Sequence, residues 1–75
     1  MFNIIKKTII EFSDIGEENI TDQTSFIEDL NLNSYDIANF IGRIEEIFDL
    51  EIPDRDLRRL QTVGELVEYL KEKAK

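Results

Sequence analysis

Apolar residues recur at helical spacing along most of this chain, most regularly between residues 37 and 48. The members of that stripe lie three and four positions apart: Ile37, Phe40, Ile41, Ile44, Ile47 and Phe48. This period predicts an amphipathic helix whose apolar face turns towards a core. Asn33 suits the N-cap of that helix, and Asp36 suits both a capping box and the positive end of the helix dipole.

A second stripe near the N-terminus predicts a helix that ends near Ser13, with an apolar face made of Phe2, Ile5, Ile9 and Phe12. Polar and turn-forming residues follow from about Asp14 to Asn33 and predict a long loop. Within it, we expect a short helical turn from Ser25 to Asp29, capped by Ser25. The side chains of Phe26 and Leu30 should lie beneath the helices.

Pro53 separates the central helix from the C-terminal part of the chain, because proline cannot continue a helix and favours extended backbone before it. Residues 49–53 therefore read as a connector pinned to the core by Leu50 and Ile52. Asp54 is a candidate cap for a short third helix that reaches Leu60. Its leucines should face inward, and Arg58 and Arg59 outward.

The sequence Thr62-Val63-Gly64-Glu65 is a capping box that starts a last helix. Lysines at positions 71, 73 and 75 suit the negative end of that helix. Its apolar stripe consists of Val63, Leu66, Val67, Leu70 and Ala74. The predicted fold is all-α: a small four-helix bundle with three longer helices, a short third helix, and a long loop between helices 1 and 2.

Length and composition limit the possible chemistry. A chain of 75 residues is expected to form one domain, spanning residues 1–75, with a small core. It has neither cysteine nor histidine, which excludes the usual zinc sites, Ser-His-Asp triads and Cys-His nucleophiles. We therefore expect no enzyme and no metal site. Lys6 and Lys7 interrupt the apolar start, so we expect a soluble cytoplasmic protein without a signal peptide or membrane insertion.

Acidic residues dominate the middle of the chain. The net charge is −8, and the stretch from Glu11 to Asp56 holds 14 acidic residues but only two basic ones, Arg43 and Arg55. Such a field repels nucleic acid and attracts basic protein surfaces, so we expect a monomer whose partners carry basic patches. The alternative is that these charges only keep a small protein soluble.

Ser34 falls in the first turn of the central helix, and the residues alone leave two roles open for it. Serine is common at helix starts, which favours a purely structural cap. A hydroxyl at this place can also bear a phosphate ester, because the free N–H groups and dipole of a helix N-terminus favour an anion. Because the chain has no cysteine, any thioester chemistry would need a thiol from a group attached to the protein, for example through such a phosphate ester.

Three segments together carry a resemblance to a known family. They are Phe26-Ile-Glu-Asp-Leu-Asn-Leu-Asn-Ser-Tyr-Asp36, Ile44-Glu-Glu-Ile-Phe-Asp-Leu-Glu-Ile-Pro-Asp54 and Thr62-Val63. Their content and spacing resemble the acyl carrier protein family over nearly the whole chain. In that family a serine at this place carries 4'-phosphopantetheine, derived from coenzyme A, through a phosphodiester. Ser34 is the matching position.

The resemblance implies a discrete carrier that holds acyl groups as thioesters for fatty acid, polyketide or related biosynthesis. Its partners would be a phosphopantetheinyl transferase, an acyl-loading ligase or transacylase, and synthase enzymes with basic docking patches. The positions matching the family's docking surface are Tyr35, Asp36, Glu45, Glu46 and Asp49. An acyl chain would shelter between the central and third helices, against residues such as Ile52, Leu57 and Leu60.

This sequence departs from the family pattern on both sides of the serine. Asn33 replaces the usual aspartate and Tyr35 the common leucine, which leaves the cognate transferase and synthase open. Two alternatives to an acyl carrier also stay open. The chain could carry an amino acid such as D-alanine, or it could be an unmodified acidic helical adaptor.

Overall fold

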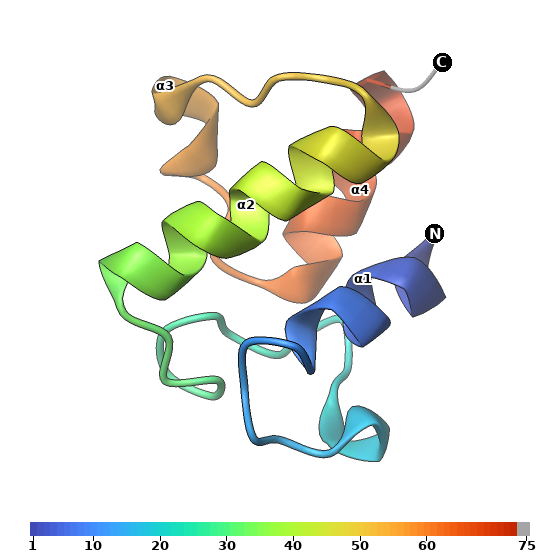
Figure 1. Cartoon of the computed structure of the whole chain (residues 1–75). Coiled ribbons are helices and arrows are strands. Elements are labelled where there is room, and N and C mark those ends of the chain that lie inside the picture. Colours follow the sequence, from blue (N-terminus) through green and yellow to red (C-terminus); the bar gives the residue numbers. More distant parts are fainter. Residues whose placement is uncertain (74–75) are drawn as a thin grey trace.

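The computed structural model describes residues 1–73 of the chain and shows a small helical bundle (Figure 1). Its elements in chain order are α1 (Phe2–Ile9), the single 3₁₀ turn η1 (Glu17–Asn19), α2 (Ser34–Phe48), α3 (Asp54–Leu57) and α4 (Val63–Lys73). α1 packs against both α2 and α4. The predicted all-α class, with three longer helices, one short one and a long first loop, is confirmed. The roles expected of Ala74 and Lys75 lie outside the described residues.

The core is built from every longer helix and from the loop. Its fully buried side chains come from α1, α2 and α4: Ile5, Ile9, Phe40, Ile44, Val63, Leu66 and Leu70. The long loop adds Ile20, Phe26, Leu30 and Leu32, and the connector adds Ile52. Among the described residues, no helix is long and apolar enough to span a membrane.

α1 ends at Ile9, so the predicted end near Ser13 was wrong. The chain does not straighten there, because the N–H groups of Glu11 and Phe12 bond to carbonyls three residues back, at 3.2 and 2.9 Å. These tighter turns bring the Phe12 ring edge-on to Phe40, with centroids 6.1 Å apart. The apolar period thus continues beyond the α-helix because the same face still packs on the core.

The long loop is fastened to the start of α4 by backbone hydrogen bonds. Phe26 donates to the Gln61 carbonyl at 3.1 Å, Val63 donates to Thr24 at 3.0 Å and Gly64 donates to Asp22 at 2.7 Å. An isolated antiparallel bridge pairs Ser25 with Thr62. The sequence pattern predicted neither this bridge nor η1. The bridge joins residues far apart in the sequence, whereas η1 is one turn closed by local bonds from the Asn19 and Ile20 N–H groups to the Gly16 and Glu17 carbonyls.

The short turn expected at Ser25 is present. Ser25 Oγ accepts the Glu28 N–H at 3.1 Å, and Asp29 Oδ2 accepts the Ser25 N–H at 2.7 Å. The turn is too short to count as a helix, yet it buries Phe26 and Leu30 as expected.

α2 presents most of its apolar stripe to the core, but Ile47 is 43% exposed, so its assignment to the core face was wrong. At about 100° per residue, Ile47 lies at the edge of the stripe, beyond Phe40, where the bundle no longer covers it. The helix ends where Asp49 adopts a left-handed conformation, with φ of 53°. Leu50, at the start of the connector, is half-buried against the core.

α3 is shorter than expected and ends at Leu57, although single turns carry the chain on to Leu60. Asp54 is its first helical residue rather than its cap, because Pro53 occupies the N-cap position. Leu57 and Leu60 pack on the core, while Arg58 and Arg59 are exposed.

The capping box of α4 is confirmed. Glu65 Oε1 accepts the Thr62 N–H at 3.0 Å, and Thr62 Oγ1 accepts the Glu65 N–H at 3.2 Å.

Candidate functional site

Ser34 is the first residue of α2, and its side chain is exposed. The capping role belongs to its neighbour, since Asn33 Oδ1 accepts the Asp36 N–H at 2.8 Å. Within residues 1–73 the Ser34 hydroxyl takes part in no hydrogen bond. The Asn33 N–H and the Asp36 carboxylate do not bond to each other either. Asn33 thus supplies the side-chain cap of α2 and leaves the Ser34 hydroxyl available.

Two buried leucines hold the end of the long loop that leads into Ser34. Leu30 and Leu32 are each about 5% exposed, and the Leu32 N–H donates to the Phe26 carbonyl at 3.1 Å. Between them Asn31 takes a left-handed conformation with φ of 55°, which asparagine tolerates better than most residues. The buried leucines hold the loop in place, so that Ser34 emerges at a defined point on the surface.

The helix start suits an attached phosphate. α2 is 15 residues long, and N–H groups in its first turn have no partner inside the helix. These groups and the helix dipole stabilise negative charge near Ser34. The carboxylate of Asp36 lies in the same turn and is half-buried.

A cavity of about 320 Å³ lies between α2, α3 and the loop. Its apolar lining comes from Phe26, Ile27, Ile37, Phe40, Ile41, Leu57 and Leu60. Polar side chains also contribute to it: Ser25, Glu28, Arg58 and Gln61. Ile37 follows Ser34 by less than one helical turn, so the cavity begins close to the serine along α2. Leu57 and Leu60 line it as expected. Ile52 was wrongly expected there, because it is buried in the core and is absent from the lining.

The expected docking residues fall into two groups along α2. Tyr35, which is 75% exposed, and Asp36 lie at its N-terminal end. Glu45, Glu46 and Asp49 gather around a shallow hollow at the other end. At about 1.5 Å per residue, Asp36 and Glu45 are separated by roughly 14 Å along the helix axis.

Glu45 differs from the other acidic residues of this set. Its side chain is half-buried, and Oε2 accepts the Ile52 N–H at 2.7 Å. This bond fastens the connector to α2, because Ile52 is itself buried in the core. Glu45 therefore has a structural role that its place on the helical wheel did not reveal, whereas Glu46 and Asp49 are exposed.

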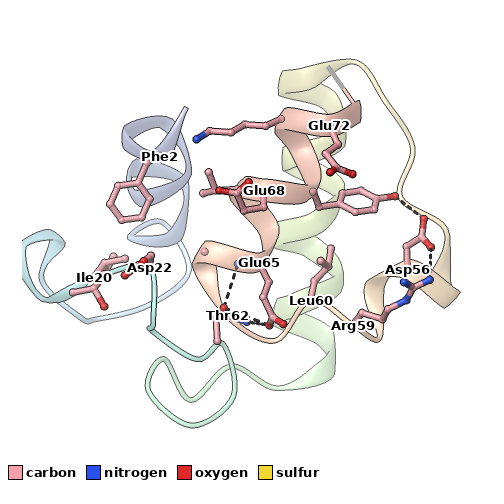
Figure 2. Close-up of a pocket in the computed structure, with 15 residues that line it drawn as sticks. Phe2, Ile20, Asp22, Asp56, Arg59, Leu60, Thr62, Glu65, Glu68 and Glu72 are labelled. Carbon is pink, nitrogen blue, oxygen red and sulfur yellow. Dashed lines mark hydrogen bonds and ion pairs between the residues drawn. The ribbon is translucent and has the colours of Figure 1, made fainter. Parts of the chain in front are cut away.

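A hollow of about 990 Å³ lies on the outer face of α4 (Figure 2). Neither Ser34 nor any of the expected docking residues lines it, whereas Leu60 contributes to both this hollow and the cavity beside α2. The hollow does display a contact that the sequence did not suggest: the Tyr69 hydroxyl donates to Asp56 Oδ2 at 2.8 Å. Burial and this bond to a carboxylate raise the pKa of Tyr69 to about 12. Tyr69 thereby joins α4 to α3.

Comparisons with known proteins show which chains resemble this one. A family model described as "Phosphopantetheine attachment site" matches residues 3–70. Acyl carrier proteins from three strains of Clostridium perfringens are 40% identical over 72 residues, which covers 96% of this chain and 95% of theirs.

Two solved structures share the fold. The acyl carrier protein of Enterococcus faecalis superposes with a TM-score of 0.80 at 33% identity, covering 92% of this chain and 87% of the other. A putative acyl carrier protein of Anaplasma phagocytophilum gives a TM-score of 0.88 at 27% identity, covering 99% and 88%.

Proposed function

Since the chain belongs to the acyl carrier protein family, we propose that Ser34 is the residue to which its 4'-phosphopantetheine is attached. Proteins of this family carry acyl groups and catalyse no step themselves. The observation that carries the proposal is the division of labour at the start of α2. Asn33 caps the helix, and the exposed Ser34 hydroxyl has no hydrogen-bond partner within residues 1–73.

The phosphopantetheine group, when bound, supplies the thiol that this cysteine-free chain lacks, and an acyl group is held on it as a thioester. The chain's own residues do three things for that group. Ser34 Oγ provides the point of attachment, and the first-turn N–H groups of α2 stabilise the phosphate. The cavity behind Ile37 offers the acyl chain an apolar environment with little water.

The lining of that cavity favours hydrocarbon cargo over aminoacyl cargo. Its seven apolar side chains come from α2, the region of α3 and the loop. The charged ammonium group of an aminoacyl thioester would lose hydration against these apolar side chains, and Glu28 is the one carboxylate in the lining that could pair with it. We therefore place the protein in fatty acid, polyketide or related biosynthesis.

Family membership implies transferase and synthase enzymes as partners. We propose that basic patches on these enzymes meet Tyr35 and Asp36 next to Ser34, and Glu46 and Asp49 farther along α2. Charges on a docking rim act mainly by steering the encounter. We further propose that residues 1–75 act as one domain in the cytoplasm, where the partner enzymes of such a carrier would be met.

The attachment is tested by incubating the protein with coenzyme A and a phosphopantetheinyl transferase and then measuring its intact mass. Wild type should gain one phosphopantetheinyl group, and Ser34→Ala should gain none. Ser25→Ala is the matched control and should be modified like wild type, since Ser25 already caps its own turn. Unchanged mass with several transferases would favour the unmodified adaptor instead.

A further inference from the structure

α3 is too short to hold its own position. It comprises only Asp54–Leu57, and no side chain caps its N-terminus. A single helical turn is unstable in water unless other parts of the protein hold it, because nucleation costs more than one turn returns. The place of α3 beside the cavity must therefore be set by contacts with the rest of the bundle.

The best-defined polar contact of α3 comes from α4. Tyr69 donates its hydroxyl proton to Asp56 Oδ2 at 2.8 Å, and the Asp56 side chain is only 19% exposed. The dashed lines at Asp56 in Figure 2 mark this bond and the contact with Arg59. Arg59 is 4.0 Å from Asp56 Oδ1 and 80% exposed, so solvent weakens its hold. A bond from a hydroxyl to a partly buried carboxylate is stronger and more directional.

Asp56 and Leu57 are consecutive residues that serve two different parts of the molecule. Asp56 faces Tyr69 of α4, while Leu57 lines the cavity together with Ile37 and Ile41 of α2. Because neighbouring helical residues are separated by about 100° around the axis, fixing the direction of one fixes the direction of the other. The hydrogen bond on the α4 side therefore controls how closely Leu57 approaches the cavity.

We propose that Tyr69 is a positioning residue for the carried acyl group: through Asp56 it holds α3 against the cavity and limits the access of water to the cargo. This inference rests on the proposed function, because it takes the apolar cavity as the shelter of the acyl chain. Tyr69 itself lines the outer hollow and does not line the cavity. It acts only through α3.

The test compares thioester hydrolysis in wild type and Tyr69→Phe, a substitution that keeps the ring and removes only the hydroxyl. Both are converted to the phosphopantetheinyl form, loaded with an acetyl or an octanoyl group, and followed by intact mass. Octanoyl hydrolysis should be roughly 2- to 10-fold faster in Tyr69→Phe, the factor by which loss of one hydrogen bond shifts a local opening equilibrium. Acetyl hydrolysis should not change, because an acetyl group is too short to use the shelter.

Ile5→Val is the matched control for a general loss of stability, since it shortens a buried side chain of α1 that does not line the cavity. Its ratio of octanoyl to acetyl hydrolysis should equal that of wild type. Equal octanoyl rates in wild type and Tyr69→Phe would overturn the proposal, and so would an equal acceleration of both thioesters. The loading step separates the two claims. If no phosphopantetheinyl group attaches, the proposed function fails; if loading succeeds and the rates do not differ, only the role of Tyr69 fails.

A second measurement needs no cargo. The amides of Arg58, Arg59 and Leu60 donate to carbonyls of residues 54, 56 and 57. In the unmodified protein these amides should exchange with solvent several-fold faster in Tyr69→Phe, whereas the buried turns of α2 should be unaffected. Unchanged exchange at these amides would contradict the positioning role.

Discussion

Asn33 and Ser34 divide the two roles that a polar residue can take at a helix start. The Asn33 side chain accepts the Asp36 N–H and caps the helix. Losing such a cap lowers the free energy of unfolding by about 1 kcal/mol. Ser34 is thereby free of a structural duty. An aspartate is usual before the serine in this family, and asparagine at position 33 performs the capping without adding a negative charge next to the phosphate site.

Tyr69 is the residue whose protonation gives a measurable pH dependence. Its pKa is raised to about 12, first by burial and then by the Asp56 carboxylate, against the smaller opposing effect of Arg55 and Arg59. Lys73 also lies near the ring, with Nζ 5.5 Å from its centroid. Because the folded pKa exceeds the unfolded value of about 10, the fold favours the neutral phenol.

This stabilisation is fully present below pH 10 and is lost as the pH rises towards 12. The free energy of unfolding should therefore fall by about 1 kcal/mol more in wild type than in Tyr69→Phe between pH 9 and pH 12, a value reduced for the partial exposure of the ring. Urea unfolding of both chains across this range measures the difference, in which groups common to both cancel. A difference that stays constant with pH would contradict the assignment.

At the scale of elements, the long loop and α4 form one unit. The Gly64 N–H donates to the Asp22 carbonyl at 2.7 Å, and a Cβ at position 64 would lie 2.7 Å from that same oxygen. Both partners are backbone, so neither can move aside easily. The close approach accounts for a glycine inside the first turn of α4, where alanine would otherwise be the better helix former.

Substituting alanine for two helical glycines should therefore have opposite effects. Gly64→Ala should lower the free energy of unfolding by about 1–3 kcal/mol, because the added methyl group forces the loop away from α4. Gly42→Ala should raise it by up to about 1 kcal/mol, since a Cβ at position 42 meets nothing within 4 Å. Chemical denaturation of both variants checks the signs. Stabilisation by Gly64→Ala would show that the loop is not fixed there.

The acidic residues at the C-terminal end of α2 should affect how tightly a partner enzyme binds this protein more than how fast that enzyme reacts with it. Combining Glu46→Lys with Asp49→Asn, which tolerates the left-handed backbone, should raise the KM of the phosphopantetheinyl transferase roughly 3- to 5-fold, with kcat unchanged. Combining Glu72→Lys with Glu68→Gln on α4 makes the same change of charge at exposed positions outside the proposed docking surface and serves as the control. An equal effect of this control would show that total charge matters rather than place.

At the scale of the whole molecule, self-repulsion opposes folding. The chain carries a net charge of −8, and its acidic residues are concentrated between Glu11 and Asp56. Opposite charges neutralise little of this within residues 1–73, where the ion pairs are Arg43 with Glu11 at 3.3 Å and Arg59 with Asp56 at 4.0 Å. Arg43 and Glu11 are about half exposed and Arg59 is 80% exposed, so solvent weakens both pairs and they contribute little.

Added salt or millimolar divalent cation should therefore raise the Tm. The expected gain is several degrees, because about 1 kcal/mol shifts the Tm of a domain of this size by roughly 4–8 °C. Thermal unfolding at low and high ionic strength measures it. A Tm that is indifferent to both additions would mean that the acidic cluster is less strained than its composition suggests.

The features that the sequence predicted correctly are those set by local pattern. The three longer helices, the Asn33 cap and the Thr62 capping box follow from periodicity and from side chains that bond within four residues. The errors concern the ends of α1 and α3, where tertiary packing decides how far a turn continues. The exposure of Ile47 likewise depends on which elements reach the end of α2.

The parts of the site that escaped prediction are contacts between segments far apart in the sequence. Glu45 read as a solvent-facing acid, and only the fold brings the Ile52 N–H to its carboxylate. Tyr69 and Asp56 are 13 residues apart, on two helices whose relative placement no local pattern contains. Ser34 was singled out because its flanking residues resemble a family motif, and its role as the attachment point stays a prediction.

The central claim is that Ser34 bears the phosphopantetheine. The most direct measurement is to treat the wild-type protein with coenzyme A and a phosphopantetheinyl transferase, digest it, and locate the added mass by fragmentation mass spectrometry. We predict a single phosphopantetheinyl group on Ser34 and unmodified peptides around Ser13 and Ser25. Attachment at either of those serines, with Ser34 unmodified, would contradict the account.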